Sequence, residues 1–144
     1  MLARLLDIDT ALLTAHTVVR RFREGDGASL YDLVQDNHQR LYDYFPQTIR
    51  MVSSKEEAEF FVRQRLADWH LQQEYTFGIW HSKATELIGM VRVHELDWKL
   101  PDAELAFFID QRYSRKGLMT EVLRALLNFS FNQLALEKLR LRTG

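Results

Sequence analysis

The segment from residue 103 to residue 142 constrains the fold of this chain more than any other part of it. An apolar run, AELAFFI, leads through the short basic loop DQRYSRKG into a long apolar-rich stretch, and KLRLR follows at 138–142. A strand, a crossover helix and a second strand make parallel neighbours in one sheet, and such crossovers are nearly always right-handed. The sequence therefore predicts a parallel pair of strands joined by a helix.

Three further strands are predicted before this unit. YTFGIW at 75–80 and ELIGMVRV at 86–93 are joined by HSKAT, a connection of the length that hairpins favour. HTVVRRF at 16–22 is rich in β-branched residues and is followed by the turn-forming EGDG. The sheet is therefore expected to be mixed and mainly antiparallel.

Two helices are predicted between these strands. Apolar residues between Ala28 and Leu41 fit one helical stripe. Ser53 and Ser54 each begin a Ser-x-x-Glu capping box, after which apolar residues recur at helical spacing as far as Trp69. The expected fold class is α/β (α+β), and because no repeat or linker marks an internal boundary, residues 1–144 are expected to form a single domain.

The composition narrows the classes of function. Nineteen Lys and Arg residues face 20 Asp and Glu residues, so no general affinity for nucleic acid or an anionic membrane is expected. The chain has no cysteine, and its five histidines form no pair at i+3 or i+4, so no metal is expected. Asp7 and Asp9 interrupt the N-terminal apolar residues, and no apolar run reaches the ~18 residues of a membrane span, which favours a soluble cytoplasmic protein.

The basic loop before the last predicted helix is a candidate anion site. The chain leaves a strand at Ile109 and enters a helix near Gly117, so free backbone N–H groups and the positive end of the helix face outward. Positive charge and a hydroxyl come from Arg112, Arg115, Lys116 and Thr120. This combination suits a phosphate or pyrophosphate, although solvated charges at an ordinary turn give the same short pattern.

Residues 75 to 142 resemble the GCN5-related N-acetyltransferase (GNAT) superfamily, and within it the RimJ/RimL-like ribosomal-protein N-terminal acetyltransferases. The resemblance is carried by FGIW, by ELIGMVRVHELDW and by the run from AELAFFIDQRYSRKGLMTE to KLRLR, with a weaker match in DNHQRLYDYFP. The acetyl-CoA signature of the family is Gln/Arg-x-x-Gly-x-Gly/Ala. Arg112 falls at its first position, Arg115 replaces the first glycine and Gly117 is the second, so Arg115 could either crowd or contact the pyrophosphate.

The resemblance implies where acetyl-CoA binds. Pantetheine would lie in a gap between the strand at 103–109 and its parallel neighbour at 138–142, hydrogen-bonded to the backbone of Phe107, Phe108 and Ile109. The loop and the first helical turn would hold the diphosphate through Arg112, Arg115, Lys116, Gly117, Leu118, Met119 and Thr120.

The resemblance also implies direct acetyl transfer to an amine. The N–H of Phe108 is the candidate that stabilises the developing oxyanion. A protein α-amine has a pKa near 7.7 to 8.0, so a carboxylate acting directly or through water suffices as a base. Glu104 is the candidate for that role, and an ion-pairing carboxylate on the strand is the alternative.

Three residues at the end of a neighbouring strand are candidate substrate contacts. They are His94, Glu95 and Asp97. The alternative is that they are solvated loop residues.

The expected activity is acetyl-CoA-dependent N-acetylation of the N-terminal amine of a ribosomal or other protein. A small-amine acetyltransferase, acting on a polyamine, amino acid or aminoglycoside, is a second interpretation. A third is a non-catalytic remnant that binds CoA or a protein partner, because the chain ends at LRTG where family members add a helix and two strands. The domain is thus expected to be C-terminally incomplete, with the strand at 138–142 at an exposed edge that could pair with a second copy.

Overall fold

The computed structural model describes residues 11–114 and 117–143 of the chain, and the side chain of residue 143 is not included in that description. The strands are β1 (Ala11–Leu13), β2 (Thr17–Arg21), β3 (Tyr75–His81), β4 (Leu87–Asp97), β5 (Asp102–Ile109) and β6 (Lys138–Thr143). The helices are α2 (Gly27–Asp36), α3 (His38–Tyr42), α4 (Pro46–Met51), α5 (Lys55–His70) and α6 (Leu118–Asn128), with short helical turns at Gln111–Tyr113 and Phe129–Gln133.

The strands form one sheet in their order along the chain, β1-β2-β3-β4-β5-β6. The pairs from β1 to β5 are antiparallel. β6 lies parallel to β5, in a register that runs from Asp102–Lys138 to Phe107–Thr143. The mixed sheet, the hairpin of β3 and β4 and the crossover through α6 confirm the prediction, whereas β1 was not predicted.

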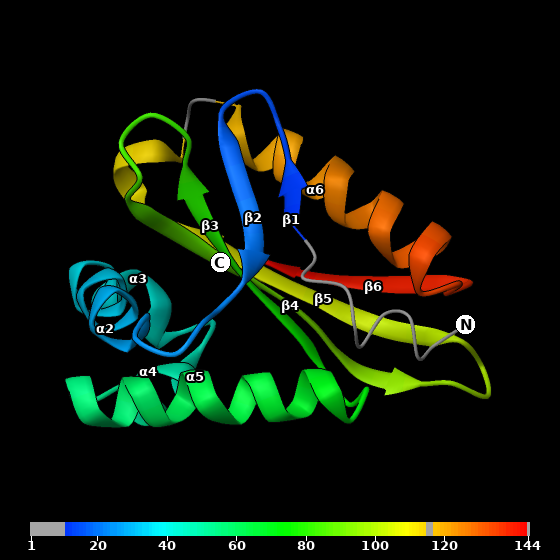
Figure 1. Ribbon diagram of the computed structural model, residues 1–144, viewed down its shortest axis with the longest axis horizontal. Helices are drawn as coiled ribbons and strands as arrows, with labels where there is room; N and C mark the ends of the chain where they lie inside the picture. The colour runs from blue at the N-terminus through cyan, green and yellow to red at the C-terminus, as the bar shows by residue number, and fades with distance from the viewer. Residues whose placement is uncertain (1–10, 115–116, 144) are drawn as a thin grey trace.

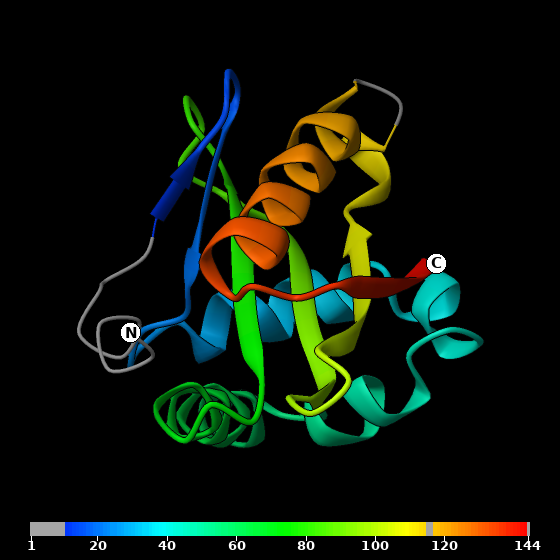
Figure 2. The same cartoon turned by 90° about the vertical axis from the view of Figure 1, so that its right-hand side faces the viewer.

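The two faces of the sheet are covered by different helices. Figures 1 and 2 show α6 on one side of the sheet and α2 to α5 on the other. Val91, Leu105 and Phe107 are buried in the core that includes α6. Met90 and Phe108 are buried in the core that includes α2 and α5. This alternation follows from the two-residue period of a strand and decides which side chains of β4 and β5 can meet.

The N-terminal helices differ in part from the prediction. The expected helix from Ala28 to Leu41 is two helices, because Asn37 has a non-helical backbone and its buried side-chain amide donates to the Leu33 carbonyl over 2.9 Å. α5 begins as expected, with the Ser54 hydroxyl accepting from the Glu57 N–H. Polar groups that bond the backbone compete with a helix ladder, which explains the break.

An irregularity interrupts the pairing of β4 with β5. The register shifts between His94 and Asp97, and Glu95 between them has a φ of +53°. A left-handed residue within a strand is the mark of a bulge, and bulges re-aim the side chains beside them. The end of β4 therefore keeps His94 in register with Glu104 and presents Glu95 outside the regular alternation.

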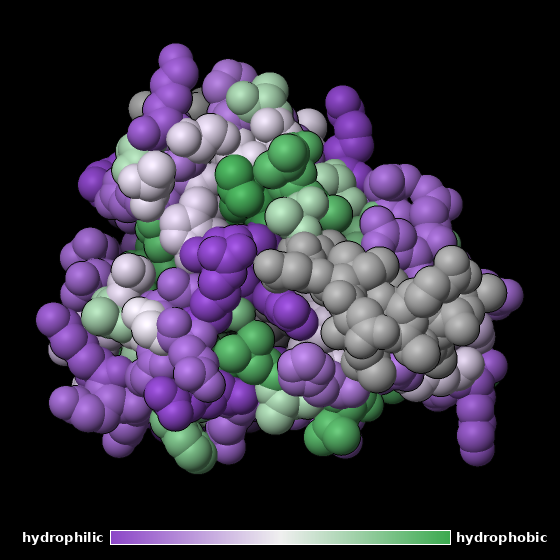
Figure 3. Space-filling view, in the orientation of Figure 1, coloured by the Kyte–Doolittle hydropathy of each residue, from purple (hydrophilic) through white to green (hydrophobic). Residues whose placement is uncertain are grey.

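The surface mixes polar and apolar side chains (Figure 3). Leu13, Leu71 and Leu100 are the most exposed of the large apolar residues. Scattered apolar residues are ordinary on a folded surface. Within 11–114 and 117–143, no helix combines the length and the apolar character needed to cross a bilayer.

Candidate active site

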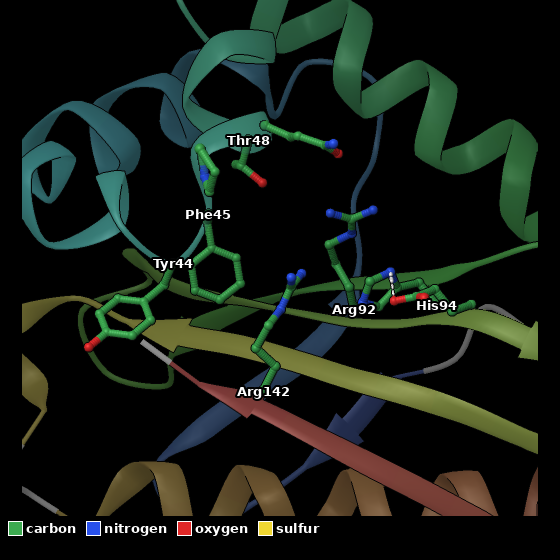
Figure 4. A pocket seen from close by; sticks show the side chains of 9 residues that line it. Tyr44, Phe45, Thr48, Arg92, His94 and Arg142 are labelled. Carbon is green, nitrogen blue, oxygen red and sulfur yellow. Dashed lines mark ion pairs between the residues drawn. The ribbon is translucent and has the colours of Figure 1, made fainter.

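A cavity of about 370 Å³ opens between the sheet and the segment that joins α3 to α4. Its lining residues are Tyr44, Phe45, Pro46, Gln47, Thr48, Arg92, His94, Glu95 and Arg142. Figure 4 shows the side chains of Arg92 and Arg142 rising from the sheet towards Phe45 and Thr48, with His94 beside Arg92 and Tyr44 to one side. The volume lies in the range of small-ligand sites, so the cavity can take the end of a peptide or a small amine.

Strand register brings the polar side chains of this face together. His94 is opposite Glu104 in the antiparallel pair, and Glu104 is beside Arg140 in the parallel pair. Leu105 and Phe107 point to the other core, so the predicted alternation of Glu104 with these two residues is confirmed. His94, Glu104, Arg140 and Arg142 thus form a row across three strands.

Both carboxylate oxygens of Glu104 have cationic or N–H partners. Oε1 lies 2.9 Å from His94 Nε2 and 3.3 Å from Arg142 Nε, and Oε2 lies 3.6 Å from Arg140 Nη1. The Glu104 side chain is 15% exposed and is not among the cavity-lining residues, whereas His94 and Arg142 are. The ion-pairing interpretation of Glu104 is therefore confirmed, and its catalytic role stays a prediction.

The charges around the cavity act on His94. Burial and the nearby charge of Arg92 lower the pKa of His94, against the opposing effects of Glu74 and Glu104. Arg92 is itself held by Glu74 through two contacts of 2.8 and 2.9 Å. Burial and Arg92 thus favour the neutral form of the imidazole.

The segment before α4 is fixed by an aromatic contact. The ring of Phe45 lies 5.6 Å from that of Phe108 on β5, and the guanidinium of Arg142 lies 5.6 Å from the Phe45 centroid. Aromatic pairs and cation–π contacts at these separations are attractive. Phe45 thus connects the segment before α4 to both β5 and β6.

The ladder of β5 decides which backbone groups face β6. The Asp110 N–H donates to the Ile88 carbonyl, and hydrogen-bonded pairs alternate along an antiparallel ladder. The N–H and C=O of Phe108 therefore face β4, whereas those of Phe107 and Ile109 face the β6 side. The register does not support the predicted oxyanion role of the Phe108 N–H, because that group lies on the opposite side of the strand from the expected gap.

The carbonyl of Ile109 has a partner within the chain. Arg40 of α3 donates to it over 3.0 Å. A pantetheine amide that bonds this carbonyl would have to share it with Arg40.

The predicted diphosphate loop is described only in part, because Arg115 and Lys116 lie outside the described residues. The guanidinium of Arg112 contacts Asp110, with Nη2 3.0 Å from Oδ2, and also Glu86. These two hydrogen-bonding carboxylates raise the pKa of Arg112. Its side chain therefore braces the loop against β5 and the β3–β4 turn.

The first turn of α6 offers open backbone donors. Gly117 precedes it with a φ of +73°, and no described side chain caps the helix. The side chain of Leu118 is buried in the core, Met119 packs against that core, and Thr120 is exposed. The N–H groups of these three residues have no carbonyl within the helix, so this turn can bind an anion as predicted for the signature.

Of the three predicted substrate contacts, two line the cavity and one does not. His94 and Glu95 line the cavity. The carboxylate of Asp97 accepts from the N–H groups of Lys99 and Leu100, so it closes the turn between β4 and β5. Asp97 does not line the cavity, and its role in binding substrate stays a prediction.

Three parts of the lining were not predicted from the sequence, namely Arg92, Arg142 and the segment from Tyr44 to Thr48. That segment begins within the weaker family match DNHQRLYDYFP, which was its signal. Arg92 and Arg142 follow from the register only once His94 and Glu104 are paired.

Three side chains at the end of β4 and on β5 carry groups that could bind a metal ion. Ligand atoms of His94, Glu95 and Glu104 lie within 4.8 Å of one another. Arg140 and Arg142 already neutralise Glu104, so this site does not favour a cation.

Comparison with known proteins defines the class of protein. Residues 16–144 match the acetyltransferase (GNAT) domain family. The chain belongs to this family and is an acyltransferase. The resemblance seen in the sequence and the expected fold are therefore confirmed.

Individual relatives are similar over most or part of the chain. "Putative ribosomal N-acetyltransferase YdaF" of Bacillus subtilis (strain 168) is 25% identical over 131 residues, 90% of this chain and 69% of that protein. "Probable N-acetyltransferase YjcK" of the same organism is 32% identical over 68 residues, 46% of this chain and 38% of that protein. A solved "putative ribosomal-protein-serine acetyltransferase from Vibrio cholerae" is 27% identical, with a TM-score of 0.79, over 92% of this chain and 73% of that one.

Proposed function

We propose that this chain transfers the acetyl group of acetyl-CoA to the N-terminal α-amine of a protein, ribosomal proteins being the leading class. The observation that carries the proposal is that β5 joins two sites. Its C-terminal end leads into the diphosphate loop and the first turn of α6. Glu104, earlier in the strand, contacts the cavity-lining residues His94 and Arg142. YdaF and the Vibrio cholerae protein, which carry ribosomal N-acetyltransferase names, support the choice of acceptor.

Acetyl-CoA would be held by backbone groups first. The amides of Leu118, Met119 and Thr120 are open to the diphosphate, and Gly117 provides the left-handed turn that exposes them. β5 and β6 pair as far as Phe107–Thr143, so the gap predicted along 103–109 is closed over those residues. The β6-side groups of Ile109, beyond that pair, would bind pantetheine. The contributions of Arg115 and Lys116 remain predictions from the signature.

The amine would enter through the cavity beneath Tyr44 to Thr48. Acetyl-CoA, when bound, supplies the thioester carbonyl that the amine attacks. The amide of Ile109, on the β6 side and beyond the last β5–β6 pair at Phe107–Thr143, would be the oxyanion donor in preference to that of Phe108. Glu104 would act on the proton of the amine through the groups that it contacts.

The test is acetyl transfer to a synthetic peptide with a free N-terminal serine. Thiol release reports turnover without background from the protein, because the chain has no cysteine. The same peptide with a blocked N-terminus is the matched control. Turnover with spermidine or an aminoglycoside but not with the peptide would move the acceptor to the small amines. Calorimetric binding of acetyl-CoA with no turnover on any of these amines would favour the non-catalytic interpretation.

The proposal includes two general expectations. Residues 1–144 act as one acetyltransferase domain of a cytoplasmic protein. The edge of β6 is a possible contact with a second copy.

A further inference from the structure

His94 lies between the cavity and Glu104. Its ring lines the cavity, which the Glu104 side chain does not. Both Glu104 oxygens already accept contacts from His94, Arg140 or Arg142. A proton from an amine in the cavity therefore meets the imidazole before it meets the carboxylate.

The contact with Glu104 fixes the tautomer of His94. A carboxylate only accepts, so Nε2 carries the hydrogen that is shared with Oε1 over 2.9 Å. The other nitrogen, Nδ1, then holds a lone pair. It lies 3.9 Å from Oε2 of Glu95, another lining residue, as the dashed line in Figure 4 marks. A carboxylate that holds one ring nitrogen and leaves the other to accept a proton is the arrangement of a catalytic triad.

The backbone beside His94 is unusual in the same place. The bulge after His94 leaves Glu95 in the left-handed region, a conformation that non-glycine residues rarely adopt. Strain and bulges of this kind gather at functional sites. This observation is independent of the hydrogen bond and points to the same residue.

The charges that face His94 suit a base that works near neutral pH. Burial and the charge of Arg92 on the same strand lower the pKa of His94. Arg142 of β6 lines the same cavity and contacts Glu104 over 3.3 Å. Glu104 from β5, Glu95 from the bulge and Glu74 behind Arg92 stabilise the imidazolium once it forms. The α3–α4 segment contributes no ionised group to the cavity lining.

We propose that His94 takes the proton of the incoming ammonium group on Nδ1 and that Glu104 is the residue that positions its ring. This inference rests on the proposed acetyl transfer. One ammonium proton passes to His94 and then to water. The amine lone pair forms the C–N bond, the C–S bond breaks, and the departing sulfur takes the second proton, so that the products are an acetylated amine and free CoA.

The kinetic test is His94→Gln in the whole chain, with acetyl-CoA and the N-terminal serine peptide. Glutamine can still donate to Glu104 but cannot take up a proton, so the fold contact survives the loss of the base. A kcat about 100-fold lower is expected, with a KM for the peptide within about threefold. The wild-type fall of kcat at acid pH, at a kinetic pKa below 6.5, should be absent from the variant.

His70→Gln is the matched control, since His70 is exposed at the end of α5. It should retain the wild-type kcat and pH profile. In Glu104→Gln the ring loses its fixed tautomer, and kcat is expected to fall while the acid limb shifts. Imidazole in the buffer should restore part of the activity to His94→Ala.

A nitrogen-15 NMR titration of the wild-type chain tests the same claim without turnover. The spectrum should show His94 neutral at pH 7 with its hydrogen on Nε2. A neutral ring with its hydrogen on Nδ1 would overturn the inference even if no acceptor is acetylated. If the wild type is active and His94→Gln keeps both kcat and the acid limb, the inference is wrong while the acetyl transfer stands.

Discussion

Arg40 of α3 donates a hydrogen bond of 3.0 Å to the carbonyl of Ile109, at the end of the strand that leads into the diphosphate loop. The same guanidinium lies 3.2 Å from the side-chain oxygen of Asn37. That oxygen also accepts from the Gln111 N–H over 3.1 Å. The break between α2 and α3 and the end of β5 are thus held by one group of hydrogen bonds.

Replacing Arg40 should loosen this connection. Arg40→Ala removes a charged donor from a buried carbonyl, which costs about 1.5–3 kcal/mol for a hydrogen bond of this type. We expect a lower free energy of unfolding in urea, with an unchanged slope. Arg50→Ala on the neighbouring helix α4, where the side chain is exposed, is the control and should change stability by less than about 0.5 kcal/mol. Equal losses in both variants would contradict the role given to Arg40.

Gly117 should be needed for its backbone conformation. A Cβ at this position meets no atom within 4 Å, so the cost of Gly117→Ala comes from the φ of +73° alone, about 1 kcal/mol. Gly25 has a φ of +99° and equally open surroundings, which makes Gly25→Ala a matched control. Both variants should lose similar stability in a melting experiment. Only Gly117→Ala should weaken acetyl-CoA binding in calorimetry, and equal affinities would argue against the α6 turn as the diphosphate site.

The pair of Glu74 with Arg92 should make stability depend on pH. Burial works to raise the pKa of Glu74, but the hydrogen bonds and charge of Arg92 outweigh it and hold the pKa below 4.5. The unfolded chain therefore takes up the proton first as the pH falls, and the contribution is full above the unfolded pKa and lost as the pH falls through the folded one. We expect the free energy of unfolding to decline below about pH 5.

Glu74→Gln isolates this contribution. The variant leaves Arg92 without its partner and should lose about 3 kcal/mol at pH 7. Its stability should change less than that of the wild type between about pH 5 and pH 3, as measured by urea unfolding. If the variant showed the same pH dependence as the wild type, the loss of stability at acid pH would have to come from other carboxylates.

The sequence predicted the elements whose signals are local. Ser54 and the apolar spacing after it predict α5. The run from the basic loop to KLRLR predicts α6 and the parallel pair of strands. The break at Asn37 was not predicted, because the side chain that donates to the Leu33 carbonyl is also held by the N–H of Gln111, 74 residues further along the chain. A helical stripe carries no trace of such a contact.

In the site, too, the parts with local sequence signals could be predicted and the parts that depend on strand register could not. The basic loop and Gly117 could be found from composition and the family signature. The free N–H groups at the start of a helix and the backbone freedom of glycine are local properties that do not depend on tertiary contacts. The position of Glu104 behind His94 and Arg142 depends on the register of three strands. For the same reason the sequence could not decide whether the Phe108 amide faces β4 or β6, because the backbone groups of successive strand residues point to opposite neighbours.

Mass spectrometry of the N-terminal serine peptide after incubation with the chain and acetyl-CoA tests the central claim most directly. The account predicts one acetyl group on the α-amine of the peptide, in an amount that matches the free CoA released. A peptide that stays unmodified while acetyl-CoA stays intact, with the chain folded and in excess, would contradict it.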